Sequence, residues 1–379
     1  MKVCYVTHMP NLYGASQSLL DLLDGLSGTE IEPYVLLGGH GPMADELKKR
    51  GIFFKVIPYA PGTDSDNFIK NAGKAFLNSR IPYRVALNRI KAFYIENGIE
   101  LVHNNSYLVG IGMHAALELH IPYICHIREF VWEGFHRRFF HAKLQRQLLD
   151  RADYRIAISE AVRKRYAQDT DQEIYVLNDG IKKDVYQLPL RRVLEGDKIV
   201  ILIAGRIGAQ KGQFEAVKAV ELLSKKSKKP IELLIVGGVG DKNYFKELRD
   251  YIREKKLGFV KFVGFSDNLR EMRRQCDIGL SCSRSEALGR VTIENMLSSL
   301  LVVSSDDTVA KELISDQVNG RLYRMGDSEN LAGVLAEVVA DSESANKLVE
   351  NAYYDAERFD HRIYAQKVFA IYRKLLDKS

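Results

Sequence analysis

Short apolar runs alternate with longer amphipathic stretches along the whole chain. In the first half, the apolar runs predict strands at residues 2–7, 33–37, 53–57, 101–103, 123–127, 155–158 and 174–177. The stretches between them, such as 15–26 and 159–167, carry apolar residues at helical spacing. Buried strands that alternate with helices are typical of parallel sheets covered by helices on both faces. The pattern therefore predicts an α/β fold.

The same pattern starts again in the second half. There the apolar runs predict strands at residues 198–204, 231–236, 260–262, 278–281, 301–304 and 321–323. Residues 181–197, between the halves, are polar, contain Pro189 and lack a strong period, which indicates an interdomain linker. We expect two Rossmann-like domains, 1–187 and 188–359, followed by a C-terminal helix within 360–379. Because parallel sheets bind ligands at the carboxyl ends of their strands, we expect the active site in a cleft between the two sheets.

The composition is that of a globular protein and excludes several other classes. Of the 379 residues, 46% are hydrophobic and 27% are charged, which excludes a disordered, collagen-like or disulfide-scaffold protein. The formal net charge of +6 is too small to indicate a nucleic-acid partner on its own. Residues 1–7 do not resemble a signal peptide, and no apolar stretch is long enough to span a membrane, so we expect a cytoplasmic protein.

A glycine-rich turn with two cations follows the first strand of the second half. Gly205, Gly208 and Gly212 permit a tight turn between that strand and the next helix. Arg206 and Lys211 place two positive charges in this turn, which suits a diphosphate. The spacing is neither that of a Walker loop nor that of a dinucleotide-binding fingerprint. A turn with solvated cations and no ligand is the alternative interpretation.

The most informative segment contains two glutamates, Glu286 and Glu294, with seven residues between them. A helix is expected to begin near Arg290, so the free amides of Leu288, Gly289 and Arg290 can bind phosphate oxygens. Glu286, before the helix, and Glu294, inside it, can then face hydroxylated groups on either side of that phosphate. Two carboxylates that flank an anion fit a sugar and a ribose.

Together these motifs resemble the retaining glycosyltransferases of family 4. The resemblance covers residues 199–323, about a third of the chain, in the family's order and spacing. It also rests on the segments Phe262-Val263-Gly264, Cys276-Asp277-Ile278 and Asn319-Gly320. In the first half, residues 13–20 are similar to the family's glycine loop, and 176–181 to its Asn-Gly exit from the N-terminal domain. Residues 125–129 lie where the family has a histidine near the transferred sugar.

This resemblance implies the GT-B fold, in which two Rossmann-like domains face each other across a cleft and the C-terminal helix crosses back to the N-terminal domain. It also implies retaining transfer of a sugar, hexosyl or related, from a UDP- or GDP-sugar to a glycan or lipid-linked acceptor, with no further cofactor. The resemblance assigns catalysis to Glu286, Arg206, Lys211 and His126. It assigns donor binding to Gly14, Gly205, Leu288, Gly289, Arg290, Glu294 and Val263.

The chain departs from the family pattern near this site. Ala287-Leu288 stands where the family usually has Gly-Phe, and Thr308-Val309 replaces two glycines. These departures leave the identity of the sugar open. The histidines and acidic residues show no metal-binding spacing, so Arg206 and Lys211 are expected to stabilise the leaving diphosphate in place of a metal ion.

Two basic segments without a single acidic residue lie in the first half, at 68–92 and 134–149. Both interleave Lys and Arg with aromatic or aliphatic residues. Since each basic residue near an anionic bilayer contributes about 1 kcal/mol, they predict reversible contact with the inner face of the cell membrane. Helices with solvated basic faces are the alternative, and a nucleic-acid partner is not expected.

Two other functions remain open from the sequence. A GT-B sugar-nucleotide epimerase would use the same donor site without an acceptor. A catalytically silent subunit would bind the sugar nucleotide, or act as a scaffold, and recruit a partner at the membrane through the basic segments.

Overall fold

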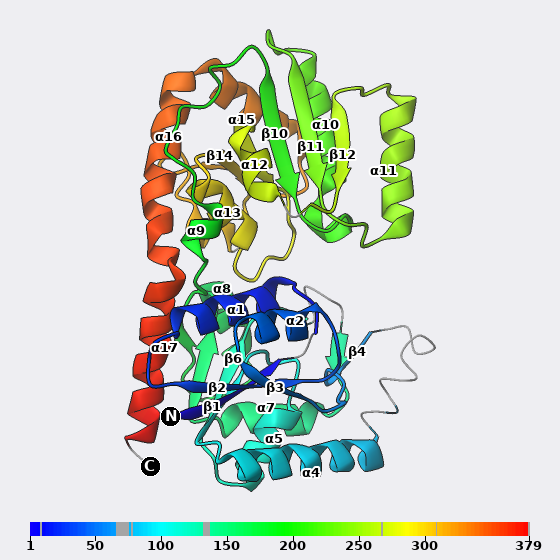
Figure 1. Cartoon of the computed structure of the whole chain (residues 1–379). Coiled ribbons are helices and arrows are strands. Elements are labelled where there is room, and N and C mark those ends of the chain that lie inside the picture. Colours follow the sequence, from blue (N-terminus) through cyan, green and yellow to red (C-terminus); the bar gives the residue numbers. More distant parts are fainter. Residues whose placement is uncertain are drawn as a thin grey trace. The chain divides into compact units, whose positions relative to one another are not determined.

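Two units, each with its own parallel sheet, make up the chain in the computed structural model (Figure 1). The first unit contains Met1–Ile181 and His361–Ser379, and the second contains Lys182–Asp360. The structure describes residues 1–7, 10–65, 76, 79–131, 137–266, 268–307 and 309–377.

A seven-stranded sheet with the order β3-β2-β1-β5-β6-β8-β9 is the centre of the first unit. Its neighbouring strands are all parallel, and Cys4 in β1 lies opposite Tyr34 of β2 on one side and Val102 of β5 on the other. The strands are β1 (Lys2–Thr7), β2 (Glu32–Leu37), β3 (Phe53–Val56), β5 (Leu101–Asn104), β6 (Tyr123–Ile127), β8 (Tyr154–Ala157) and β9 (Tyr175–Val176). These bounds agree closely with those that the apolar runs predict.

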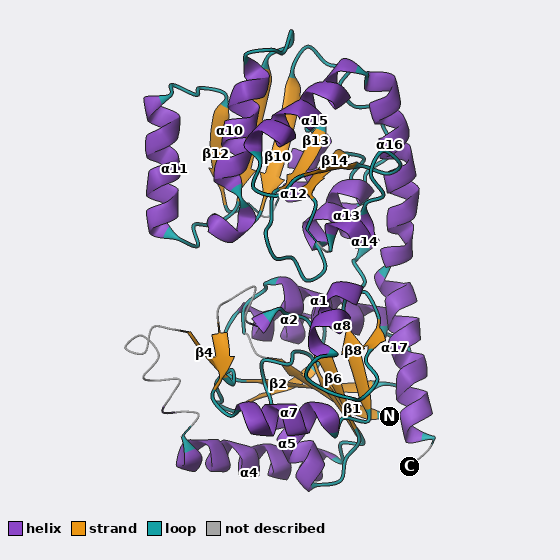
Figure 2. Cartoon of the chain, turned by 180° about the vertical axis from the view of Figure 1, so that it is seen from behind, coloured by secondary structure: helices purple, strands orange, loops and turns teal. Residues whose placement is uncertain are grey.

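Helices cover both faces of this sheet (Figure 2). They are α1 (Gly14–Gly25), α2 (Pro42–Lys49), α4 (Arg80–Asn97), α5 (Ile111–Glu118), α7 (Ala142–Asp150), α8 (Glu160–Tyr166) and α17 (His361–Leu376). Val368 and Tyr372 of the C-terminal helix α17 pack with Leu22 of α1 against Tyr5 and Val35 of the sheet. The last helix of the chain thus completes the core of the first unit, as expected.

A short antiparallel pair that the sequence does not predict lies beside this sheet. It joins β4 (Thr63–Ser65) to β7 (Arg137–Phe139), so that part of the basic segment 134–149 is a strand. Strands of three residues are too short for a recognisable alternation of apolar and polar positions.

The second unit has a six-stranded parallel sheet with the order β12-β11-β10-β13-β14-β15. Its strands are β10 (Ile199–Ala204), β11 (Ile231–Val236), β12 (Val260–Gly264), β13 (Ile278–Ser281), β14 (Leu301–Ser305) and β15 (Arg321–Tyr323). Its helices are α9 (Lys183–Tyr186), α10 (Gln213–Ser224), α11 (Lys242–Glu254), α12 (Leu269–Arg274), α13 (Arg290–Leu297), α14 (Ala310–Leu313), α15 (Ser328–Ala340) and α16 (Ser342–Asp355), with the 3-10 turns η2 (Ala209–Lys211) and η3 (Ala356–Phe359).

Every residue of β10 is buried, because helices pack on both faces of the sheet. Ile201 and Ile203 belong to the core that contains residues of α10 and α15. Val200 and Leu202 face the other way, toward Met272 of α12. A strand that is apolar on both faces is what a sheet between two helical layers requires.

The segment predicted as an interdomain linker packs on the second unit instead. Val193 and Leu194 are buried in its core. The side-chain amide of Gln187 donates to the Tyr353 hydroxyl at 2.9 Å, and the Ser298 hydroxyl donates to the carbonyl oxygen of residue 186 at 2.8 Å. Residues 182–187, which the sequence places in the first domain, therefore lie in the second. The apolar residues of this segment are too few and too irregularly spaced to reveal their burial.

Candidate active site

The glycine-rich turn lies at the carboxyl end of β10 and packs directly on the loop that follows β13. Gly205 has a φ of 143°, and Gly212, at the start of α10, has a φ of 65°. A Cβ atom on Gly212 would lie only 2.2 Å from the carbonyl oxygen of Cys282. The amide of Arg284 also donates to the Gln210 carbonyl at 3.0 Å. The two sequence motifs therefore form one surface.

Lys211 and Glu286, which come from these two motifs, form an ion pair. Lys211 Nζ donates to Glu286 Oε1, and the side chains are 31% and 23% exposed. Burial disfavours the charged form of Glu286, but Lys211 and a hydrogen bond with Ser283 outweigh burial and hold the pKa of this carboxyl below its ordinary value. Glu286 is therefore ionised at neutral pH, and a ligand that binds either side chain must compete with the other.

A second carboxylate fixes the loop that carries Glu286. Asp307 Oδ2 accepts a hydrogen bond from the Glu286 amide at 3.3 Å, and Oδ1 accepts one from the Ala310 amide at 2.8 Å. Burial raises the pKa of Asp307. Glu286 and Asp307 line one small cavity together with Gly289 and Thr292. Hydroxyl groups of a ligand in this cavity would meet two carboxylates.

Helix α13 begins beside the same cavity. Its N-cap, Gly289, has a φ of 80°, a conformation that residues with a Cβ atom rarely adopt. Leu288 is buried and Arg290 is half-buried. The helix dipole adds partial positive charge at this end. The amides of Thr292 and Ile293 donate to the Gly289 carbonyl at 2.9 and 3.3 Å, and the binding of a phosphate by the amides of residues 288–290 stays a prediction.

Glu294 lies inside α13, where the structure pairs it with a cation that sequence reasoning missed. Its Oε2 accepts a hydrogen bond at 2.6 Å from Nη2 of Arg273, a fully buried residue of α12. Arg273 also donates through Nε to Asn295 at 3.0 Å. The role of Glu294 at a ribose stays a prediction, but its pair with Arg273 explains how a carboxylate is held in this interior position.

The remaining predicted residues of the second unit lie at the same edge of its sheet. Arg206 directly follows Gly205, and its side chain is exposed. Val263 is in the edge strand β12, whose end pairs with the end of β11 through a hydrogen bond from the Gly237 amide to the Gly264 carbonyl at 2.8 Å. Val263 does not line the cavity beside Glu286. Its contact with a donor stays a prediction.

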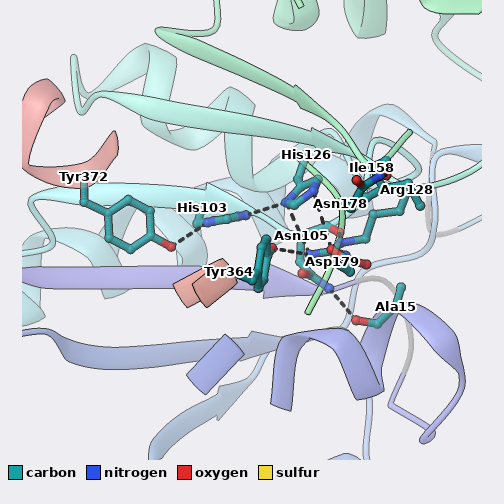
Figure 3. A network of polar contacts seen from close by, with 10 residues as sticks. All are labelled: Ala15, His103, Asn105, His126, Arg128, Ile158, Asn178, Asp179, Tyr364 and Tyr372. Atoms are coloured by element: carbon teal, nitrogen blue, oxygen red, sulfur yellow. Dashed lines mark hydrogen bonds and ion pairs between the residues drawn. The ribbon is translucent and has the colours of Figure 1, made fainter. Parts of the chain in front are cut away.

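The two predicted residues of the first unit, Gly14 and His126, differ in their exposure to solvent. Gly14 is exposed, begins α1, and has open space where a Cβ atom would be. His126, in β6, is 0% exposed. Figure 3 shows its ring inside a polar network that includes His103 and Arg128. A role of His126 at the transferred sugar stays a prediction, because in this structure its ring faces only protein groups.

Burial keeps both histidines of this network uncharged. It lowers the pKa of His103 to about 3, with a smaller contribution from Arg128. It lowers the pKa of His126 well below the ordinary value, and the charges of Arg128 and His103 act in the same direction. Each ring therefore has one N–H donor and one nitrogen acceptor at neutral pH.

The two basic segments are described only in part. Residues 68–75, 77 and 78 of the first, and 134–136 of the second, lie outside the described residues. In α4, Arg84 and Arg89 are exposed beside the exposed apolar residues Ile81 and Val85. Lys91 forms an ion pair with Glu118 at 2.7 Å, so one of the basic residues is neutralised within the unit.

Two kinds of feature are absent from the described part of the chain. No group of three His, Cys, Asp or Glu side chains in it could hold a metal ion. Among the helices of these residues, none has both the length and the apolar character that a membrane span requires.

Comparison with known proteins gives a family for both units. Residues 14–185 match the sequence family "Glycosyltransferase Family 4", and residues 190–355 match "Glycosyl transferases group 1". An uncharacterized glycosyltransferase of Methanocaldococcus jannaschii is 22% identical over 368 residues, which are 91% of this chain and 97% of that one. The N,N'-diacetylbacillosaminyl-diphospho-undecaprenol alpha-1,3-N-acetylgalactosaminyltransferase of Campylobacter jejuni is 23% identical over 358 residues, 92% of this chain and 84% of the relative.

A solved structure with the same fold is that of Anabaena HepE in complex with UDP. It has a TM-score of 0.82 and 22% identity, and the match covers 99% of this chain and 100% of HepE. HepE in complex with UDP-glucose matches with a TM-score of 0.80, 22% identity and the same coverage. The fold is thus the GT-B fold. With family matches to both units, this chain belongs to the family 4-type glycosyltransferases.

Proposed function

We propose that the protein transfers a sugar from a UDP- or GDP-linked donor to a hydroxyl group of a glycan or lipid-linked acceptor, with retention at the anomeric carbon and without a metal ion. The observation that best supports this proposal is the Lys211–Glu286 ion pair beside the N-terminus of α13. A cation, a carboxylate and helix amides at one place suit a diphosphate that carries a sugar. The UDP-glucose complex of HepE and the lipid-linked diphosphate named for the C. jejuni relative suggest the classes of donor and acceptor.

Each group in the second unit would have one role. Arg206, Lys211 and the amides at Gly289 would bind the diphosphate, and Glu294 would bind the ribose. A bound diphosphate gives Lys211 a second anionic partner, so that Glu286 becomes available to the hydroxyl groups of the sugar. Gly205, Leu288, Arg290 and Val263 would complete the donor site. Gly14 and His126 would contribute from the first unit.

The transfer itself would need no side-chain base. The bond between the anomeric carbon and the phosphate oxygen breaks, and the bond to the acceptor oxygen forms on the same face of the sugar. The proton of the acceptor hydroxyl passes to the departing phosphate oxygen. Arg206 and Lys211 would stabilise the negative charge that develops on that diphosphate.

A donor screen tests this proposal. The purified protein is incubated with UDP- and GDP-sugars, with and without a membrane extract as acceptor source, and with EDTA to test metal independence. We expect transfer that survives EDTA and a product whose anomeric configuration, determined by NMR, matches that of the donor. Lys211→Met and Glu286→Gln should abolish most of the activity. Lys225→Met is the matched control, because it breaks an exposed Lys–Glu pair on α10 with a distance of 3.0 Å.

Other outcomes of the same screen would contradict the proposal. No binding of any nucleotide sugar, or full activity in both site variants, excludes it. Inverted configuration excludes the retaining mechanism. Donor binding without turnover in the presence of membrane extract indicates the silent subunit, and formation of an epimer without an acceptor indicates the epimerase.

We further propose that helix α4 brings the enzyme to an anionic membrane that contains its acceptor. The support is the set of exposed residues on α4, in which Ile81, 77% exposed, and Val85 alternate with Arg84 and Arg89. Flotation with phosphatidylglycerol vesicles should recover the protein, whereas phosphatidylcholine vesicles should not. Changing both arginines to glutamate should abolish flotation. The same change at Lys246 and Arg249, which are exposed on α11, is the control and should have little effect. Equal recovery on both lipids would contradict the proposal.

A further inference from the structure

Arg128 is the centre of the buried network in the first unit (Figure 3). It is 4% exposed, and all three of its guanidinium nitrogens are engaged. Nε donates to the main-chain oxygen of Asn105 at 2.8 Å, and Nη1 forms an ion pair with Asp179. Nη2 donates to the Tyr364 hydroxyl and to Nδ1 of His126, both at 3.2 Å. One side chain therefore joins its own segment, which includes His126, to three segments that are distant in the sequence and contain Asn105, Asp179 and Tyr364.

The first of these connections leads to α1. Asn105 is fully buried directly after β5, and its side-chain amide donates to the main-chain oxygen of Ala15 at 3.0 Å. Its own main-chain amide donates to Val6 in β1 at 2.9 Å. Two hydrogen bonds thus separate the guanidinium of Arg128 from the first turn of α1, which starts at Gly14 (Figure 3).

Two other connections lie where the chain leaves and re-enters the first unit. Asp179 comes two residues before the division after Ile181, and Tyr364 is in the first turn of α17. The His361 amide donates to the Ile181 carbonyl at 3.1 Å, so the two segments are adjacent. Arg128 binds both of them.

The fourth connection fixes the proton positions of two histidines. A guanidinium can only donate, so Nδ1 of His126 accepts from Arg128 and carries no proton. The neutral His126 ring is then protonated at Nε2, which lies 3.8 Å from Asp179 Oδ1. Nε2 of His103 lies 3.1 Å from the same Nδ1 and must donate, so the Nδ1 of His103 that faces the Tyr372 hydroxyl at 2.6 Å carries no proton. One arginine thus sets the tautomer of both rings.

We propose that Arg128 is a positioning residue of the glycosyltransferase, which holds the first turn of α1 and the ring of His126 in the arrangement that transfer requires. The proposal rests on the proposed function, in which Gly14 and His126 act at the donor. Lysine cannot replace arginine here. Its ammonium group is a single point that can pair with Asp179 but cannot also reach Asn105, Tyr364 and His126 in the plane of a guanidinium.

Two variants and a matched control test this role. In Arg128→Lys the positive charge remains, but the planar guanidinium with its three donor nitrogens is lost. In Arg128→Met/Asp179→Leu the buried ion pair is replaced by apolar side chains, a change that often preserves stability. Arg155→Lys is the control, because Arg155 is a buried arginine of the neighbouring strand β8 that donates to the main-chain oxygens of Leu149 and Asp150.

We expect both Arg128 variants to fold and their kcat to fall about 10- to 100-fold, the effect of a small misplacement of the groups that act at the donor. Arg155→Lys should keep its kcat. Wild-type kcat in both Arg128 variants would overturn the proposal. A rise in KM at unchanged kcat would also overturn it, because transfer itself would then not depend on the arrangement that Arg128 holds.

Two measurements without substrate separate this proposal from the proposed function. Long-range proton–nitrogen NMR should show wild-type His126 protonated at Nε2, and the Nδ1 form should appear in Arg128→Met/Asp179→Leu. Hydrogen exchange of residues 16 and 17 in α1 should accelerate in both Arg128 variants but not in Arg155→Lys. Protonation of wild-type His126 at Nδ1, or unchanged exchange, would overturn the positioning role even if transfer is active. If no donor reacts but the Arg128 variants show both the change of tautomer and the faster exchange, the proposed function fails and the structural part of the inference stands.

Discussion

Replacing Arg273 with methionine should strongly destabilise the second unit. Arg273 is fully buried, and it donates to Glu294 at 2.6 Å and to Asn295 at 3.0 Å. Its guanidinium also lies 5.5 Å from the ring centroid of Tyr186. Methionine occupies a similar space but leaves the carboxylate of Glu294, whose side chain is 10% exposed, without its cation.

The expected size of this effect follows from burial. Removing one partner of a buried ion pair costs about 3–5 kcal/mol, because an uncompensated charge remains in the interior. In a unit of this size 1 kcal/mol shifts Tm by about 2–4 °C, so the Tm of the second unit should fall by about 6–20 °C. Differential scanning calorimetry measures this shift. Arg155→Met, in the first unit, identifies which transition belongs to which unit.

A double variant separates loss of the ion pair from loss of packing. In Arg273→Met/Glu294→Leu no buried charge remains, so most of the lost Tm should return. A fall in Tm of less than about 2 °C in Arg273→Met would contradict the argument from an unpaired buried carboxylate. A double variant that is no more stable than Arg273→Met would contradict it as well.

Three more predictions concern the loops around the cavity. Gly212→Ala should weaken nucleotide binding at least tenfold in calorimetric titration, because its Cβ atom would lie 2.2 Å from the Cys282 carbonyl oxygen; unchanged affinity would contradict this. The lowered pKa of Glu286 means that its ion pair stabilises the fold above the carboxyl's ordinary pKa and loses this effect as pH falls through the lowered pKa. Urea unfolding from pH 7 to pH 3 should therefore show a steeper loss of stability in the wild type than in Glu286→Gln, and equal slopes would refute it. Asp307→Asn should lower kcat about tenfold, because an amide cannot accept at both positions, and wild-type kcat would show that this carboxylate does not hold Glu286 in place.

Much of the fold could be predicted from the sequence, because both sheets are buried on their two faces. The strands are then continuous apolar runs, such as 199–204, that stand out from the amphipathic helices between them. The pair of β4 and β7 was missed because each strand has three residues. The sequence predicts a linker at residues 181–197 because Val193 and Leu194 are surrounded by polar residues, and only the tertiary contacts reveal that these two residues are buried.

The candidate site was predictable where it depends on local motifs. The positive φ angles of Gly205, Gly212 and Gly289 follow from tight turns that the glycines themselves indicate. Lys211 lies close to Glu286 because the turn after β10 and the loop after β13 are at the ends of neighbouring strands. The roles of Arg273 and Arg128 are not predictable because the carboxylates that they bind, Glu294 and Asp179, lie 21 and 51 residues away, which no spacing rule detects. A buried arginine has the same sequence signal as an exposed one.

The position of α17 in the first unit has a consequence for the order of folding. Residues 182–360 are synthesised before this helix, although Val368 and Tyr372 belong to the core that Leu22 and Val35 begin. At a synthesis rate of about 5–20 residues per second, that core stays open on one side for about 10–40 s. The second unit can complete its fold in this time. The chain is thus built in an order in which its first half is the last part to close.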